Sequence, residues 1–203
     1  MLLHLALPVL LAAAPGTPAA AWPLSAELLA GADAAANAPP DFKRQLVRHR
    51  ERLMAGIRDA AAADVGKRDA AAHRAAAARA ARQIAAAIRG HRPFPDVAYE
   101  AGGLVHEAAA AALLASGTAD AAGLSQASRR AAFFGYTATP FGDPEALAGG
   151  ASVPSGAPPR AVYDAAVSTA TRLFAWVWKD AGGDASIVRK FPASGGPYPL
   201  RGD

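Results

Sequence analysis

Three histidines lie among apolar residues at helical spacing, and an imidazole can serve as a metal ligand or as a general base near neutral pH. His49 stands between Leu46 and Leu53, while His73 and His106 lie in alanine-rich segments. Residues three and four apart share one face of a helix, so each imidazole is predicted to point inward with its apolar neighbours. Such faces can assemble a zinc site when separate helices meet in a bundle. The alternative is a buried histidine that is hydrogen-bonded to a backbone carbonyl or a carboxylate.

Local spacing alone demands no metal. No segment contains an H-x-x-x-H or H-E-x-x-H pair, so no single helix offers two histidine ligands. Glu100 and Glu107 share a face with Gly103, and paired carboxylates are suited to acid–base work, but a solvated helix face is the simpler interpretation. The chain has no cysteine, which excludes disulfides and thiolate metal sites. Ser-His-Asp arrangements, phosphate-binding loops and nucleotide fingerprints are absent from the sequence.

The composition predicts an all-α, single-domain helical bundle with a long Pro/Gly-rich loop. Of the 203 residues, 52% are hydrophobic and only 7% aromatic, and alanine dominates the apolar share. Alanine loses no side-chain entropy in a helix, and alanine faces let helices approach closely. The periodicity and the capping residues predict helices over residues 24–37, 41–58, 67–89, 96–117, 123–134 and 159–181, with a loop over 137–159.

The two ends differ from the helical domain predicted over residues 22–185. Met1–Ala14 is apolar but short for a membrane span, and Ala19 and Ala21 fit the small-residue rule of a signal-peptidase site. We therefore expect residues 1–21 to be a signal peptide, cleaved before Trp22, and the protein to be periplasmic or secreted. A buried N-terminal helix is the alternative. Residues 186–203 are expected to form an irregular tail.

A net charge of +4 is compatible with an acidic partner. Arg44, Arg48 and Arg52 have the spacing of one helical face, which would suit an anionic membrane or the phosphates of a nucleic acid. Glu51 lies beside this row, and a solvated helix face is the simpler interpretation.

The pattern Y-E-x-G-x-L-V-H at residues 99–106, entered through RPFPDV, resembles the zinc helix of bacterial zinc-dependent phospholipase C and of the related fungal single-strand-specific nucleases. That family's helix reads Gly-x-x-x-His-x-x-x-Asp, followed by Pro-x-His. Gly102 and His106 match it, whereas Ala110 takes the aspartate position and the second histidine would fall near Ser116.

This resemblance implies an exported, phospholipase C-like helical fold. It also implies that the mature chain begins at Trp22, whose terminal amine and carbonyl would bind zinc. On this basis the expected metal ligands are Trp22, His106 and His49.

The incomplete motif implies a degraded site. A three-zinc phosphodiesterase needs many imidazole and carboxylate ligands, and only His49, His73, His91 and His106 follow the leader. We therefore expect a non-catalytic binding or structural module, such as an envelope component, without a cofactor and without strong phosphodiesterase activity. One alternative is an active zinc phosphodiesterase, acting on phospholipid or nucleic acid, that keeps a residual zinc ion. The other is a basic helical protein that binds nucleic acid or an anionic membrane.

Overall fold

The computed structural model describes residues 22–64, 69–118, 120–129, 142–149 and 153–185, and within these ranges it contains α-helices and no strand. The helices are α1 (Leu24–Asn37), α2 (Pro40–Arg48), α3 (Arg50–Ala63), α4 (Ala70–Arg89), α5 (Phe94–Ser116), α6 (Ala121–Ser128), α7 (Pro144–Gly149) and α8 (Pro159–Asp180). The predicted all-α class is confirmed. The expected signal peptide and irregular tail lie outside the described residues.

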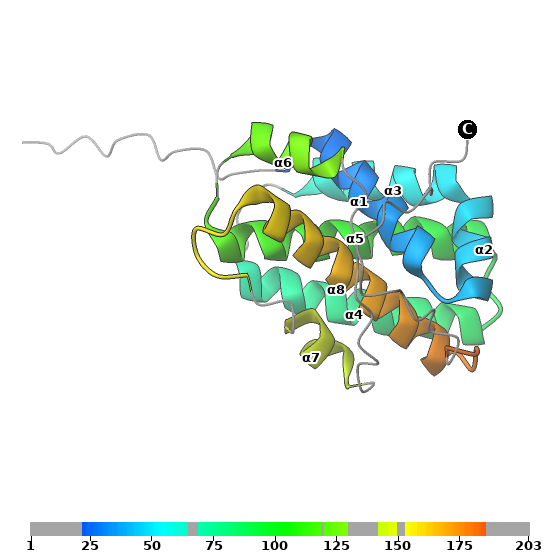
Figure 1. The fold of residues 1–203 in the computed structure, drawn as a ribbon. Coiled ribbons are helices and arrows are strands. Elements are labelled where there is room, and N and C mark those ends of the chain that lie inside the picture. Colours follow the sequence, from blue (N-terminus) through cyan, green and yellow to red (C-terminus); the bar gives the residue numbers. More distant parts are fainter. Residues whose placement is uncertain (1–21, 65–68, 119, 130–141, 150–152, 186–203) are drawn as a thin grey trace, which may run out of the picture.

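Helix α5 runs through the middle of the bundle (Figure 1). It packs against α1, α3, α4 and α8, while α6 and α7 lie at the periphery, against α8 and α4 respectively. Gly117 ends α5 in the left-handed conformation (φ 63°), which glycine adopts without the steric cost of a Cβ. No helix in the described ranges combines the length and the apolarity needed to cross a bilayer.

Glycines bring the backbones of α3 and α5 into direct contact. A Cβ added to Gly56 would lie 1.9 Å from the carbonyl oxygen of Tyr99, and one added to Gly102 would lie 2.2 Å from that of Leu53. Since the obstructing atoms are backbone, no side-chain rotation could relieve either clash. This contact fixes α5 against α3 one turn before His106.

The core is rich in alanine, as the composition predicts, and its aromatic residues gather at α2 and α8. Phe42 meets Phe174 edge to face, with ring centroids 5.7 Å apart, and stacks on Trp178 at 5.3 Å. Aromatic pairs in such arrangements contribute about 0.5–1.5 kcal/mol each beyond the area they bury. They fasten α2 firmly to the end of α8.

Three predicted elements differ from the structure. The helix expected over residues 123–134 is the shorter α6, which ends at Ser128. The helix expected over residues 41–58 divides at His49 (φ −107°, ψ 31°), which lets α2 bury Phe42 against α8 while α3 packs along α5. The loop expected over residues 137–159 contains α7, whose first turn is capped by Asp143, the acceptor of a 2.7 Å hydrogen bond from the Ala146 amide. A short capped helix of this kind has too few residues to show a periodic pattern.

Candidate metal centre

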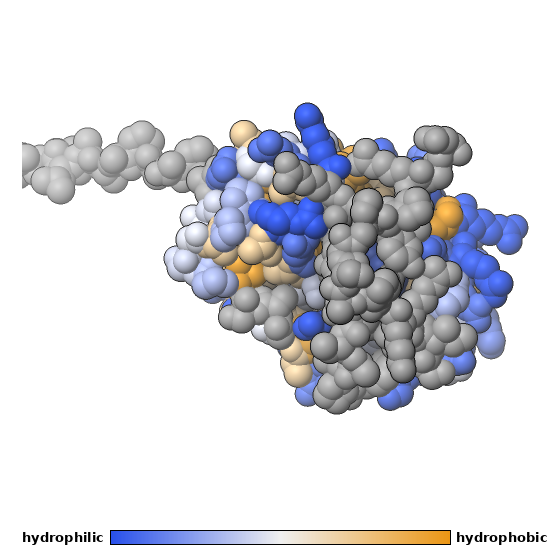
Figure 2. Space-filling model, in the orientation of Figure 1, coloured by the Kyte–Doolittle hydropathy of each residue, from blue (hydrophilic) through white to orange (hydrophobic). Residues whose placement is uncertain are grey.

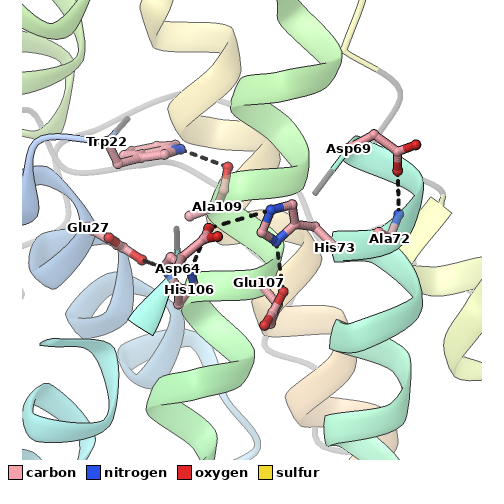
Figure 3. Close-up of polar contacts among 9 residues, drawn as sticks. All are labelled: Trp22, Glu27, Asp64, Asp69, Ala72, His73, His106, Glu107 and Ala109. Atoms are coloured by element: carbon pink, nitrogen blue, oxygen red, sulfur yellow. Dashed lines mark hydrogen bonds and ion pairs between the residues drawn. The ribbon is translucent and has the colours of Figure 1, made fainter. Parts of the chain in front are cut away.

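Two histidines from different helices converge on one carboxylate oxygen. His73 lies in the first turn of α4 and His106 in the middle of α5. Their Nε2 atoms lie 3.5 Å and 3.3 Å, respectively, from Oδ2 of Asp64, which follows the end of α3 (Figure 3). Within the described residues, these are the side chains whose donor atoms gather closely enough to hold one metal ion.

Each imidazole is held on its other side by a glutamate. His106 Nδ1 lies 2.7 Å from Oε1 of Glu27, and His73 Nδ1 lies 2.8 Å from Oε2 of Glu107. A carboxylate can only accept a hydrogen bond, so both Nδ1 atoms carry the proton and donate it. Both Nε2 atoms therefore face Asp64, either with a second proton or with a free lone pair.

The charge balance of this cluster suits a divalent cation. Three carboxylates surround two imidazoles, and the cluster carries one net negative charge when both rings are protonated. A dipositive ion that replaces the two Nε2 protons leaves the same net charge. Without those protons or such an ion, nitrogen and oxygen lone pairs would face one another in a poorly hydrated site, which is unfavourable.

The separations also suit a metal. Ligand atoms about 2.0–2.2 Å from a tetrahedral zinc ion lie about 3.3–3.6 Å from one another. The two distances between Nε2 and Oδ2 are 3.3 Å and 3.5 Å, whereas charge-assisted hydrogen bonds are normally about 2.7–2.9 Å. The contacts to the glutamates have that shorter length, which is the arrangement of carboxylates that orient metal-binding histidines.

The centre is largely shielded from solvent. His73 and His106 are buried, and the side chains of Asp64 and Glu107 are 15% and 16% exposed. Burial lowers the pKa of His106, but the hydrogen bond that it donates to Glu27 and the charges of Glu27, Glu107 and Asp64 outweigh this effect, and the net shift is upward. The residue thus holds a proton more firmly than a free imidazole does.

Local features of the sequence position these groups. Asp69 caps α4 by accepting a 2.8 Å hydrogen bond from the Ala72 amide, and His73 follows one turn later. Asp64 ends α3, and its amide donates to the carbonyl of Ala60. The glycine contact between α3 and α5 then sets where His106 lies relative to the end of α3.

The structure places the sequence-predicted ligands differently. His106 is at the centre, whereas His49 is only partly buried, at the break between α2 and α3, and does not belong to the group. Trp22 lies beside the centre, and its indole donates a 2.7 Å hydrogen bond to the carbonyl of Ala109 (Figure 3). That bond orients the Trp22 side chain. It does not involve the terminal amine, whose expected role as a metal ligand stays a prediction. His91 lies at the turn after α4 and also outside the group.

The sequence does not identify Asp64 as a ligand, or Glu27 and Glu107 as the hydrogen-bond partners of the histidines. Glu27 reads as an ordinary acidic residue in the first turn of α1. Asp64 follows a run of alanines and belongs to no periodic pattern. The one available signal was that His73 and His106 both lie on apolar stripes, because carboxylates must accompany imidazoles that are buried with a proton.

Comparison of this chain with protein-family models, with curated proteins and with solved structures gives no match. The resemblance to the zinc-dependent phospholipases C and nucleases therefore remains a prediction based on residues 99–106.

Proposed function

We propose that this protein binds one divalent transition-metal ion, zinc in the first instance, through His73, His106 and Asp64. The observation that carries the proposal is the convergence of two Nε2 atoms on one Asp64 oxygen, with each Nδ1 atom held by a separate glutamate. Glu27 and Glu107 would keep the Nε2 lone pairs directed at the metal. The expectation of a degraded site is modified accordingly: Ala110 supplies no ligand, and Asp64 takes part from the residue that follows α3.

The donor set favours zinc over calcium or magnesium. Two imidazole nitrogens and one carboxylate oxygen match the ligands of zinc, while calcium and magnesium prefer oxygen alone. Two histidines and one carboxylate also form the ligand set of non-haem iron(II), so iron is the competing ion.

A second candidate function, hydrolysis, follows from the number of ligands. Three protein ligands leave a position for water, as in catalytic zinc sites, and bound zinc lowers the pKa of such a water to about 7. With the resemblance to phospholipase C and the expected export, the substrate class proposed for this activity is a phosphodiester, either a phospholipid or a single-stranded nucleic acid. Trp22 remains the candidate fourth ligand in a chain from which the expected signal peptide, residues 1–21, has been cleaved.

Metal content and affinity test the first proposal. Protein purified without chelator is expected to hold about one zinc ion per chain, as three convergent ligands form one site. Cobalt substitution is expected to give the intense visible bands of a tetrahedral centre. His73→Ala and Asp64→Ala should abolish tight binding, whereas His49→Ala should bind normally. Equal loss in the His49 variant, or no bound metal in the unaltered protein, would refute the assignment.

Hydrolysis is tested separately. Release of choline phosphate from phosphatidylcholine and of nucleotides from single-stranded DNA should depend on zinc and disappear in Asp64→Ala. A protein that binds zinc tightly but hydrolyses neither substrate would retain the metal site and lose the hydrolase proposal.

A further inference from the structure

We propose that the outer face of α2 docks on an anionic phospholipid bilayer. This face consists of Lys43, Arg44, Val47 and Arg48, with Arg50 following at the start of α3. It is distinct from the metal centre, because Asp64 lies at the opposite end of α3, and a 14-residue helix is about 21 Å long.

An apolar side chain stands in the middle of this face. Val47 is 55% exposed, more than any other large hydrophobic residue in the described ranges. Lys43 and Arg44 precede it by four and three residues and therefore flank it on the helix surface. Lone exposed apolar residues are common, but one flanked by cations on the same helix has the composition of an interfacial helix.

The cations around Val47 are largely available to a partner. Arg44 pairs with Asp41, whereas Lys43, Arg48 and Arg50 make no ion pair within the part of the chain that the structure describes. The side of the molecule on which α2 lies carries a group of hydrophilic residues in Figure 2. Basic residues beside an anionic membrane contribute about 1 kcal/mol each at moderate salt, or about fivefold in partitioning.

The buried face of α2 holds this helix in a fixed orientation on the bundle. Phe42 and Leu46 are fully buried, and the Phe42 ring stacks on Trp178 of α8. The helix cannot turn its buried face outward without losing these contacts, so the basic face remains the one presented to solvent. Docking then requires no rearrangement of the bundle.

A bilayer suits this face better than a nucleic acid. Single-stranded nucleic acids are usually held by cations together with exposed aromatic rings on which the bases stack. The aromatic residue of α2, Phe42, is buried, and the exposed apolar residue of this helix is Val47. A valine side chain gains nothing from contact with a phosphate backbone. In the headgroup region of a membrane, the same methyl groups leave water.

Vesicle sedimentation with the full chain tests the proposal. Binding is expected for phosphatidylcholine vesicles that contain phosphatidylglycerol, and it should weaken as salt is raised. Vesicles of phosphatidylcholine alone report the contribution of apolar residues 1–21, which is subtracted. Arg48→Glu should lower the salt-sensitive partitioning by more than about fivefold, because it removes one cation and adds an anion, and Val47→Ser should lower partitioning by about threefold.

Two control variants separate an effect of this face from an effect of net charge or of exposed apolar surface elsewhere. Arg79→Glu, on the exposed side of α4, changes the net charge equally, and Leu24→Ser removes the other large apolar side chain that is exposed among the described residues. Both should bind as the unaltered protein does. Equal losses in the Arg48 and Arg79 variants would mean that only net charge matters. Unchanged binding of Val47→Ser, or tighter binding to single-stranded DNA that ignores Val47, would also overturn the proposal.

Discussion

The imidazole rings of His73 and His106 stand nearly perpendicular to each other, with an interplanar angle of 77° and centroids 6.1 Å apart. Each ring is held at Nδ1 by its own glutamate, and the two glutamates come from α1 and α5. Neither imidazole can turn away from Asp64 without breaking a hydrogen bond. Orienting carboxylates hold histidine ligands in the same way in metalloproteins, which supports the proposed metal site.

Glu27 should influence metal affinity more than Glu107. The Glu27 side chain is 2% exposed, so water cannot take its place, whereas the 16% exposed Glu107 side chain leaves room for a substitute. We expect Glu27→Gln to weaken zinc binding by about 10–100-fold and Glu107→Gln by less, with both proteins folded. Competition with a chromophoric chelator measures both affinities. An unchanged affinity in the Glu27 variant, or a larger loss in the Glu107 variant, would contradict this role.

Adjacent glycines in α5 should respond in opposite ways to alanine. A Cβ at position 102 would lie 2.2 Å from the Leu53 carbonyl oxygen, so Gly102→Ala must push α3 and α5 apart. The expected loss in unfolding free energy is about 3 kcal/mol, with weaker zinc binding because His106 moves relative to Asp64.

Gly103 is the matched control for this experiment. An added Cβ there meets no atom within 4 Å, so Gly103→Ala should stabilise the protein by about 0.5–1 kcal/mol. Urea unfolding of both variants and metal titration of the folded proteins provide the measurements. Similar free energies for the two variants would show that the close helix contact does not fix the centre.

The sequence predicts much of the fold because helices are local. Apolar spacing and the glycine at position 117 place α1, α5 and α8 within a few residues of their observed ends. The break at His49 escapes such reasoning, because the apolar spacing continues across it and only the packing of α2 on α8 requires the bend.

The centre could be predicted only in part for a related reason. His73 and His106 are recognisable as inward-facing residues from their apolar neighbours. Their partners are not, since Glu27 lies 79 residues from His106 along the chain and meets it only through the packing of α1 on α5. Asp64 likewise depends on where α3 ends relative to the other helices. Contacts between residues so far apart in the sequence cannot be predicted from local periodicity.

The metal-free protein should lose stability as the pH rises through the titration of His106. The pKa of this residue is raised above its ordinary 6.5. Burial lowers the pKa, but the combined effect of Glu27, Glu107 and Asp64 in raising it is larger. A raised folded-state pKa means that the folded chain binds the proton more tightly than the unfolded chain. The contribution is therefore complete below about pH 6.5 and disappears above the folded-state value.

Urea midpoints measured in chelator across this window should fall with pH in the unaltered protein and stay flatter in His106→Gln. The zinc-loaded protein should show the opposite trend, because metal binding releases protons and strengthens as the pH rises. A metal-free midpoint that rises between pH 6.5 and alkaline pH would show that His106 is neutral in the folded protein.

Introducing an acidic residue at position 110 provides the sharpest test of the resemblance. Ala110 lies one turn beyond His106 and is largely buried, and helical geometry places it between the faces of His106 and Glu107. In Ala110→Asp, a carboxylate would enter a cluster that already has three, so the metal-free protein should be destabilised by about 2–4 kcal/mol.

Zinc bound to the Ala110→Asp variant would gain a fourth ligand, and its affinity should rise by about tenfold or more, because the ion offsets the added charge. Ala112→Asp is the control, since this buried residue points away from both faces and should destabilise the protein with and without zinc. Equal destabilisation of the metal-free and zinc-loaded forms in Ala110→Asp would mean that position 110 does not face the metal, and the resemblance to the phospholipase C helix would then end at Gly102 and His106.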